Sequence, residues 1–524
     1  MSYASLSLLF SFLVASYAYW QHRSRYRNVP PGPPGLPLIG NLLDMPTSEE
    51  WIRYKQWSRE YSECPTEYEV PETDYIEESD IIHLNVCGTR IIVLNSLKIV
   101  VDLLDKRSSI YSSRMGFGWS FITMPNNDLW KSHRRQFREE FEGTAIHKYY
   151  SAITRSTHDM LCRMVEAPER WDEHIRYMVG ASIIDITYGI RAKPTNDPFI
   201  ALAEKTLGII NSAVKPGAFL VDALPILKYV PEWVPGAGFQ TKAREWGQVG
   251  VQMLEASFDV MKKSIADGVA RPSYCQSRLE NGDDEDLVKN SAGTVYLAQI
   301  RQVDTINRRT SVLTLPQLSS VLKTFVLAMT LHPEMQARAQ LEIDMLIGKN
   351  ALPTISDQQS TPYLTALIKE CLRWGLLAPF AVPHMLVKDD VYEGHFLPAG
   401  SLIMPNSWAI ANDEGAYPNP EVFDPERYLK DGQLDPSVLA PESFAFGYGR
   451  RVCPGRTLAA NSAWLVTASL LAAFTIEKAV DAKGAIIEPS GKISPGMIRH
   501  PEPFQCKIVP RNKEMREIVL GTRD

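Results

Sequence analysis

A single cysteine in a glycine-rich turn, followed at once by a long apolar helix pattern, constrains this chain most. Residues 441–457 read Pro-Glu-Ser-Phe-Ala-Phe-Gly-Tyr-Gly-Arg-Arg-Val-Cys-Pro-Gly-Arg-Thr, and the apolar pattern of Thr457 to Phe474 begins there. Glycine permits turns that other residues avoid and lets the backbone approach a flat ligand closely. The N-terminus of the following helix favours a thiolate at Cys453.

The surroundings of Cys453 limit what it can bind. No other Cys or His lies within 45 residues of it, so a local zinc site, which needs about four ligands, is excluded. A single axial thiolate to haem iron needs only one cysteine. Arg451 adds a donor that suits a carboxylate. A buried free cysteine in a glycine-rich turn is the alternative, whereas a P-loop is disfavoured because the G-K-[ST] sequence is missing.

Helical periodicity dominates the rest of the chain. Apolar residues recur at intervals of three and four in the ranges 153–165, 246–266, 318–346, 363–374 and 457–474. Two shorter stretches, 80–95 around Cys87-Gly88 and 392–404, predict short strand pairs. We therefore expect one mainly α domain with a small β part over residues 40–524.

The N-terminal segment predicts a membrane anchor. No Asp, Glu, Lys, Arg or His precedes His22, and residues 3–20 are just long enough to span a bilayer. Arg23, Arg25 and Arg27 follow and favour the cytosolic side. We expect an anchor at 1–21 and a basic, proline-rich hinge at 22–39. A cleaved signal peptide is the alternative, although the basic residues follow the apolar run rather than precede it.

Composition excludes several other classes. The net charge of −6 gives no strongly basic domain, so nucleic acid is not an expected partner. Seven cysteines are scattered without a CxxC pair, which favours reduced thiols over a disulfide framework.

With these residues in view, the chain resembles the cytochrome P450 family, and most closely its fungal microsomal members. The haem-loop pattern of that family is F-x-x-G-x-R-x-C-x-G. The matching residues, with Gly447 inside the same loop, are Phe446, Gly449, Arg451, Cys453 and Gly455. The resemblance implies the cytochrome P450 fold behind one N-terminal transmembrane helix, and haem b with an axial thiolate from Cys453.

Two further motifs occur in the order that the family requires. Glu370 and Arg373 form its E-x-x-R, and Arg427 stands in its P-E-R motif; the family uses these three residues structurally. Trp130 and Arg134 form its W-x-x-x-R, which resembles the residues that bind the haem propionates.

A basic stripe lies beside that last motif. Lys131, Arg135 and Arg138 are spaced to share a helix face, which is either solvated or, as in the family, docks the acidic flavin domain of a reductase.

The resemblance implies an activity and its partners. It predicts a monooxygenase of the endoplasmic reticulum membrane, single-pass with a cytosolic catalytic domain, that inserts one oxygen atom into a small lipophilic substrate. Electrons would come from NADPH through NADPH–cytochrome P450 reductase, with cytochrome b5 as an optional second donor. A haem-thiolate isomerase or dehydratase that needs no reductase is an alternative.

The match breaks in the long helix that carries the family's oxygen-activating acid and alcohol. Asp304 and Thr305 can be read as that pair, but Arg301 and Gln302 replace small residues, and Pro316 interrupts the helix. Residues 299–317 and the acidic stretch 62–79 look inserted. We hypothesise that one or both were translated from unspliced intron, which would make this chain a haem-binding but catalytically impaired protein.

Overall fold

The computed structural model describes residues 28–61, 79–115, 119–213, 219, 221, 225–299, 317–496 and 498–523. These residues belong to two compact units, Met1–Arg114 with Val382–Asn406 and Met115–Ala381 with Ser407–Asp524. The predicted anchor at 1–21, most of the segments 62–79 and 299–317, and the predicted catalytic residues Asp304 and Thr305 lie outside the described residues.

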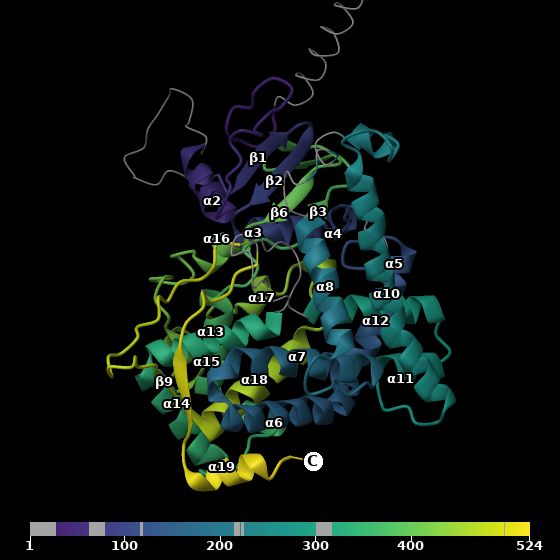
Figure 1. Cartoon of the computed structure of the whole chain (residues 1–524). Coiled ribbons are helices and arrows are strands. Elements are labelled where there is room, and N and C mark those ends of the chain that lie inside the picture. Colours follow the sequence, from purple (N-terminus) through teal and green to yellow (C-terminus); the bar gives the residue numbers. More distant parts are fainter. Residues whose placement is uncertain are drawn as a thin grey trace, which may run out of the picture. The chain divides into compact units, whose positions relative to one another are not determined.

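The smaller unit contains a mixed sheet of four strands in the order β1-β2-β6-β3, with a separate β4–β5 pair (Figure 1). The predicted hairpin at 80–95 is confirmed as antiparallel β1 and β2. The elements of this unit are α2 (Glu50–Glu60), β1 (Ile81–Val86), β2 (Thr89–Leu94), α3 (Leu97–Val100), the π-helix η1 (Val101–Lys106), α4 (Ser108–Tyr111), β3 (His384–Met385), β4 (Asp390–Tyr392), β5 (His395–Leu397) and β6 (Leu402–Pro405).

The described part of the predicted hinge is bound to the first strand. The backbone N–H of His83 donates to the carbonyl of Pro31 at 2.9 Å, and Gly40 forms an antiparallel bridge with Val86. A Cβ on Gly32 would meet the His83 carbonyl oxygen at 2.2 Å, so the close approach requires glycine. Proline lacks an N–H but keeps its carbonyl acceptor, and this half of the hinge therefore belongs to the folded body of the smaller unit.

The larger unit is mainly helical. Its helices are α5 (Asp128–Phe141), η2 (Gly143–Tyr149), α6 (Tyr150–Glu166), η3 (Pro168–Arg170), α7 (Trp171–Tyr188), α8 (Pro198–Ala213), η4 (Pro225–Tyr229), α10 (Gly238–Ala266), α11 (Tyr274–Glu280), α12 (Glu285–Gln299), α13 (Gln317–Leu331), α14 (Pro333–Leu346), η5 (Ile355–Ser360), α15 (Pro362–Trp374), α16 (Ser407–Ala411), η6 (Pro425–Tyr428), α17 (Glu442–Ala445), η7 (Gly449–Arg451), α18 (Arg456–Ala473) and α19 (Lys513–Leu520). Its strands form the antiparallel pairs β7 (Leu429–Lys430) with β8 (Gln433–Leu434) and β9 (Phe474–Lys478) with β10 (Cys506–Pro510).

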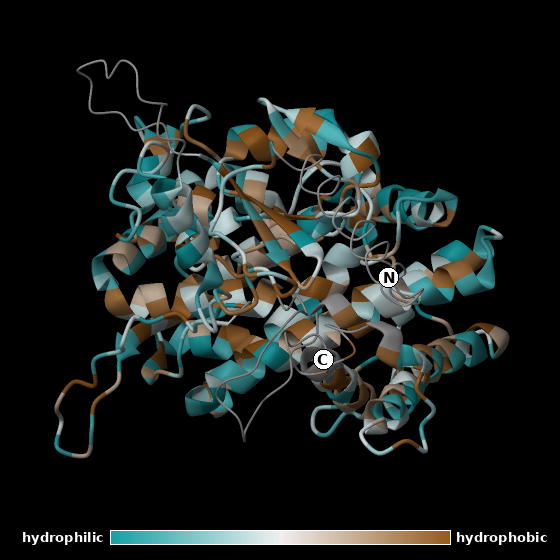
Figure 2. Cartoon of the chain, turned by 90° about the horizontal axis from the view of Figure 1, so that it is seen from above, coloured by the Kyte–Doolittle hydropathy of each residue, from teal (hydrophilic) through white to brown (hydrophobic). Residues whose placement is uncertain are grey.

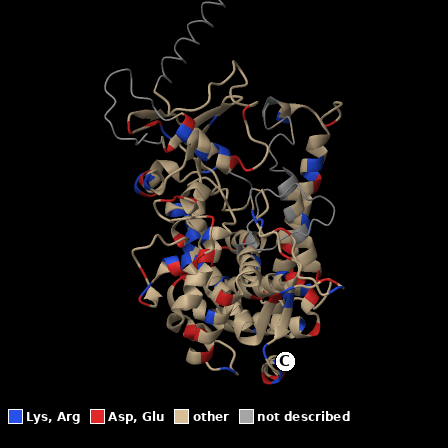
Figure 3. Cartoon of the chain, turned by 90° about the vertical axis from the view of Figure 1, so that its left-hand side faces the viewer, with Lys and Arg blue, Asp and Glu red and all other residues tan. Residues whose placement is uncertain are grey.

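One hydrophobic core, built from α5, α6, α7, α10–α15 and α18, fills the larger unit. Many of its ribbons change between brown and teal along their length, as amphipathic helices do (Figure 2). Charges of both signs are interspersed over the outer helices, whereas several inner helices are almost wholly tan (Figure 3). α13 is one of the inner helices, since residues 318–330 are all buried.

Two sequence expectations need correction. The pattern at 318–346 is two helices, because α13 ends at Leu331 and Pro333 takes the first position of α14, where its missing N–H costs nothing. The strand pair expected at 392–404 is instead β4 with β5, while β6 joins β2 in parallel within the larger sheet.

As for membrane crossing, the ranges described between residues 28 and 523 include no helix with both the length and the apolar character to span a bilayer.

Candidate functional site

The loop around Cys453 is shaped by two left-handed glycines. Gly447 has a φ of 78° and Gly449 a φ of 52°, a region that favours glycine, and the chain turns there between α17 and the start of α18. The N–H of Cys453 donates to the carbonyl of Phe446 at 2.8 Å, which closes the loop on itself. A Cβ on Gly455 would meet nothing within 4 Å, so space is open beside the cysteine.

Arg451 fastens this loop to the segment before α5. Its Nη2 donates to the carbonyl of Met124 at 2.7 Å and its Nη1 to that of Phe121 at 3.4 Å. Its guanidinium carbon lies 4.0 Å from the centroid of the Trp130 ring, a cation–π arrangement. These contacts are made to backbone carbonyls and an aromatic face, and the carboxylate partner that the sequence suggests for Arg451 stays a prediction.

Arg134 holds the same loop from α5. Its Nη1 donates to the carbonyl of Val452, the residue before the cysteine, at 2.8 Å. Its guanidinium carbon lies 6.0 Å from the Trp130 ring centroid, so the predicted shared face of these two residues is observed. Burial lowers the pKa of Arg134, and the nearby Cys453 sulfur opposes that shift.

The electrostatics at Cys453 combine opposing effects. Burial raises the pKa of its thiol, while the N–H of Gly455 and the guanidinium groups of Arg134 and Arg456 lower it. Burial is the largest of these effects. The helix-terminus argument from sequence therefore captured one contribution and missed the larger cost of desolvation.

Glu370 and Arg373 form a fully buried ion pair on α15. Arg373 donates from Nη2 to Glu370 Oε1 at 2.6 Å and from Nε to Glu370 Oε2 at 2.9 Å. Arg427 reaches Oε1 at 3.3 Å, and the N–H of Asp424 donates to the same oxygen at 3.0 Å. The predicted association of the three motif residues is therefore present, with one carboxylate serving two guanidinium groups.

The two arginines also organise the chain between α16 and η6. Arg373 donates to the carbonyls of Pro420 at 2.7 Å and Ala411 at 3.1 Å, and Arg427 donates to that of Pro418 at 3.0 Å. These bonds fix an irregular stretch whose carbonyls would otherwise lack partners. Only the fold reveals these carbonyl partners, because no sequence pattern marks them.

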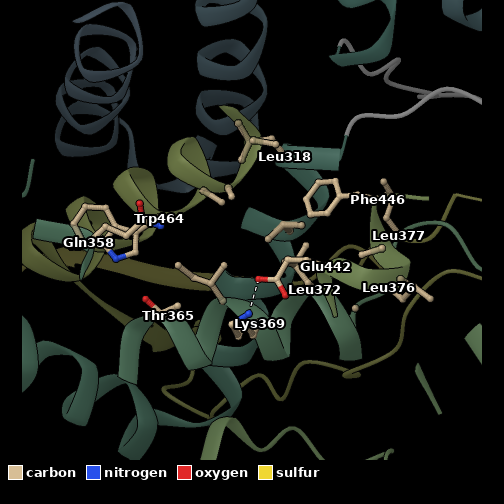
Figure 4. A pocket seen from close by; sticks show the side chains of 17 residues that line it. Leu318, Gln358, Thr365, Lys369, Leu372, Leu376, Leu377, Glu442, Phe446 and Trp464 are labelled. Carbon is tan, nitrogen blue, oxygen red and sulfur yellow. Dashed lines mark hydrogen bonds and ion pairs between the residues drawn. The ribbon is translucent and has the colours of Figure 1, made fainter. Parts of the chain in front are cut away.

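A cavity of about 70 Å³ lies against the start of the Cys453 loop, lined mainly by α13, α15 and α18. Leu318, Leu377 and Phe446 face it, and an ion pair of 2.6 Å between Lys369 and Glu442 lies at its edge (Figure 4). Most of its lining is apolar.

In a comparison with known protein families, the model of the cytochrome P450 family matches residues 30–508 of this chain. Tryptamine 4-monooxygenase of Psilocybe cyanescens is 40% identical over 98% of this chain and 99% of its own length. Cytochrome P450 monooxygenase 98 of Postia placenta is 39% identical over 98% and 97%. The chain belongs to the cytochrome P450 family. Cytochromes P450 are haem-thiolate proteins, and these relatives are monooxygenases.

The residues present fit a haem-thiolate centre. Cys453 is a free cysteine with open space beside it at Gly455, and two arginines border its loop. Haem brings its own nitrogen ligands, so the single thiolate of Cys453 is enough protein ligation to hold it.

The Glu370 cluster generates a stability prediction. We expect Glu370→Gln to lower the free energy of unfolding by about 3–5 kcal/mol, since two buried guanidinium groups lose their carboxylate. Urea unfolding followed by circular dichroism measures this. Glu426→Gln is the matched control, because its ion pair with Arg338 is half-exposed and such pairs contribute about 1 kcal/mol or less. Equal losses in both variants would contradict the assigned importance of the buried pair.

Proposed function

We propose that this cytochrome P450 is a membrane-anchored monooxygenase that inserts one oxygen atom from O₂ into a small lipophilic, secondary-metabolite substrate with NADPH-derived electrons. The observation that carries the proposal is the Cys453 loop, closed on Phe446 and held by Arg134 and Arg451. Membrane attachment by residues 1–21 and a cytosolic catalytic domain at the endoplasmic reticulum are part of the proposal and rest on the sequence alone.

Each site residue has a role in this proposal. Bound haem with an axial thiolate supplies the oxygen-activating chemistry. Cys453 ligates the iron through a loop that Phe446, Gly447, Gly449 and Gly455 shape.

The remaining residues bind the cofactor's edge or hold the loop. Trp130, Arg134 and Arg451 lie beside the loop and would orient the propionates. Glu370, Arg373 and Arg427 hold the stretch of chain that precedes it. Asp304 and Thr305 are proposed as the pair that delivers protons.

A lipophilic substrate is supported by the apolar lining near Leu377. The name of one relative, a tryptamine 4-monooxygenase, supports a small metabolite as the substrate. An apolar wall selects by shape and desolvation rather than by hydrogen bonds. The proposal therefore goes no further than the class of small lipophilic metabolites.

Electron delivery is assigned to the basic face of α5, which would dock NADPH–cytochrome P450 reductase, or cytochrome b5 as an optional second donor. Lys131, Arg135 and Arg138 are all exposed. Asp128 pairs with Lys131 at 2.8 Å and Glu142 with Arg138 at 3.3 Å. Arg135 is exposed without such an ion pair among the described residues, so its charge is available to an acidic partner.

A second candidate is an impaired or mis-spliced product. It is favoured by the contrast between the buried helices α12 and α13 and the charged sequence that separates them. Residues 291–297 of α12 and 318–330 of α13 are buried, yet the intervening sequence contains Arg301, Arg308 and Arg309. Three arginines between two buried helices are costly unless each finds partners.

The length of α7 supports the same candidate. Asp172, near the start of α7, pairs with Lys323, and Tyr188 at its end packs on Tyr296 with ring centroids 5.7 Å apart. Asp172 and Tyr188 are about 24 Å apart along the axis of α7. Their partners Lys323 and Tyr296 would be about 40 Å apart on one continuous helix, which is too far. If residues 300–316 were removed, the partners would be about 15 Å apart, and long side chains can span the remaining difference.

The first measurement is a reduced carbon-monoxide difference spectrum of the whole chain in microsomes. We expect the strongly red-shifted Soret band of a thiolate-ligated haem, and its loss in Cys453→Ser. A protein that folds and binds haem without this band would contradict the haem-thiolate assignment.

Residues 299–317 separate the two candidates. A variant that lacks this segment and carries a rebuilt small-residue acid–alcohol turn is compared with the full-length chain for NADPH-dependent turnover with reductase. The working-enzyme proposal expects turnover from the full-length chain, whereas turnover from the rebuilt variant alone supports the mis-spliced candidate. Sequencing the mature transcript is the independent check, because an intron-derived segment would be absent from it.

The docking assignment predicts slower reduction after charge reversal. Arg135→Glu with Arg138→Glu should slow reductase-driven haem reduction about tenfold at low salt, with the difference shrinking as salt screens the charges. Stopped-flow absorbance measures the rate, and haem content should stay unchanged. Arg244→Glu on α10 is the control, and an equal effect from it would argue against docking at α5.

A further inference from the structure

His133 connects two helices that have different tasks in the proposed reaction. It lies on α5, between Trp130 and Arg134, and its side chain is completely buried. Its Nδ1 is 2.6 Å from the Oγ of Ser291 on α12, a residue that is also completely buried. The Oγ of Ser291 lies 3.3 Å from Oε1 of Gln136, one turn further along α5.

The bond between His133 and Ser291 joins neutral groups. Burial lowers the pKa of His133 to about 4, so the imidazole is uncharged at cellular pH. The ring of Phe121 stacks on it, with centroids 5.5 Å apart and planes 14° apart. Because the ring is neutral, the hydrogen bond works as a fixed link rather than as a pH-dependent switch.

The other ring nitrogen of His133 takes no part in this link. Nε2 is buried with no hydrogen-bond partner among the described residues. The hydrogen bond that the ring makes within the described part of the chain is therefore the one that ties α5 to α12.

The neighbours of His133 show what is being fixed. Arg134 donates to the Val452 carbonyl beside Cys453, and the Trp130 ring lies under Arg451 of the same loop. One turn of α5 thus contacts the Cys453 loop through two residues and α12 through a third.

α12 is also held by close packing and by an ion pair at its first residue, where Glu285 meets Lys262 of α10 at 2.8 Å. The bond to His133 is placed further along the helix, beside the Cys453 loop. A Cβ on Gly293 would lie 2.2 Å from a Leu254 methyl and 3.2 Å from the Trp119 ring. The sequence after Gln299 also departs from the family pattern.

We propose that His133 is a positioning residue that holds α12, the start of the oxygen-activating helix, at a fixed place relative to the Cys453 loop. The effect of this positioning on oxygen activation rests on the proposed function. The hydrogen bond between α5 and α12 does not depend on that function.

The first test measures α12 directly and needs no substrate. Hydrogen-exchange mass spectrometry compares the whole protein with His133→Leu and Ser291→Ala. Both variants should speed exchange in peptides from 285–299 about fivefold, because a lost link of about 1 kcal/mol raises local opening by that factor. The double variant should add little to either single one. His133→Asn, whose amide nitrogen replaces Nδ1, should restore slow exchange.

The second test reads the open coordination position of the haem. Imidazole is titrated into each haem-loaded protein and its dissociation constant is read from the Soret shift. We expect His133→Leu and Ser291→Ala to change that constant at least fivefold in the same direction, with the reduced carbon-monoxide band intact. His133→Asn should stay within twofold of the parent chain.

Tyr149→Phe is the matched control for both tests. It removes a buried hydrogen bond to Glu140, at the other end of α5, without touching α12. Unchanged exchange in 285–299 for His133→Leu and Ser291→Ala, or an equal change in Tyr149→Phe, would overturn the inference. A missing thiolate band in the parent chain would instead count against the proposed function, and the exchange test would still decide the role of His133. Should His133→Leu fail to fold, Ser291→Ala and His133→Asn carry both tests.

Discussion

The chain segment that leads to the Cys453 loop depends on one interaction, the buried ion pairing of the Glu370 carboxylate with two arginines. A buried ion needs its full set of partners, and Glu370 receives them from Arg373, Arg427 and the N–H of Asp424. Those arginines in turn bind the carbonyls of an irregular stretch that leads toward the Cys453 loop. Removing the carboxylate would leave two cations and several carbonyls unsatisfied at once, so the cluster behaves as a unit.

Helix α5 is the second organiser, because three residues of one of its turns contact two other parts of the larger unit. Trp130 and Arg134 bind the loop that carries the cysteine, and His133 binds α12. The exposed face of the same helix carries Arg135, which is available to an acidic partner. A single helix therefore connects the proposed cofactor loop, the proposed oxygen-activating helix and the proposed path of electrons.

Much of the architecture could be predicted from the sequence, because it follows from local periodicity. The β1–β2 hairpin and the helices α6, α15 and α18 lie where alternation and apolar spacing placed them. Apolar periodicity runs on across the boundary at Pro333, which only the proline itself marks in the sequence. The parallel pairing of β6 with β2 could not be placed from local pattern, since a parallel partner is distant in sequence. The partners of Arg451 were missed for a related reason, because backbone carbonyls leave no mark on the sequence.

The sequence by itself determined the family, through the spacing of Phe446, Gly449, Arg451, Cys453 and Gly455, because glycines and a lone cysteine at fixed intervals report the turn and the ligand directly. It also located the departure from the family at 299–317. Only the tertiary structure decided that one carboxylate serves two arginines, that burial raises the pKa of the Cys453 thiol, and that His133 joins α5 to α12. The physical reason is that desolvation and hydrogen bonding depend on which distant residues the fold brings together.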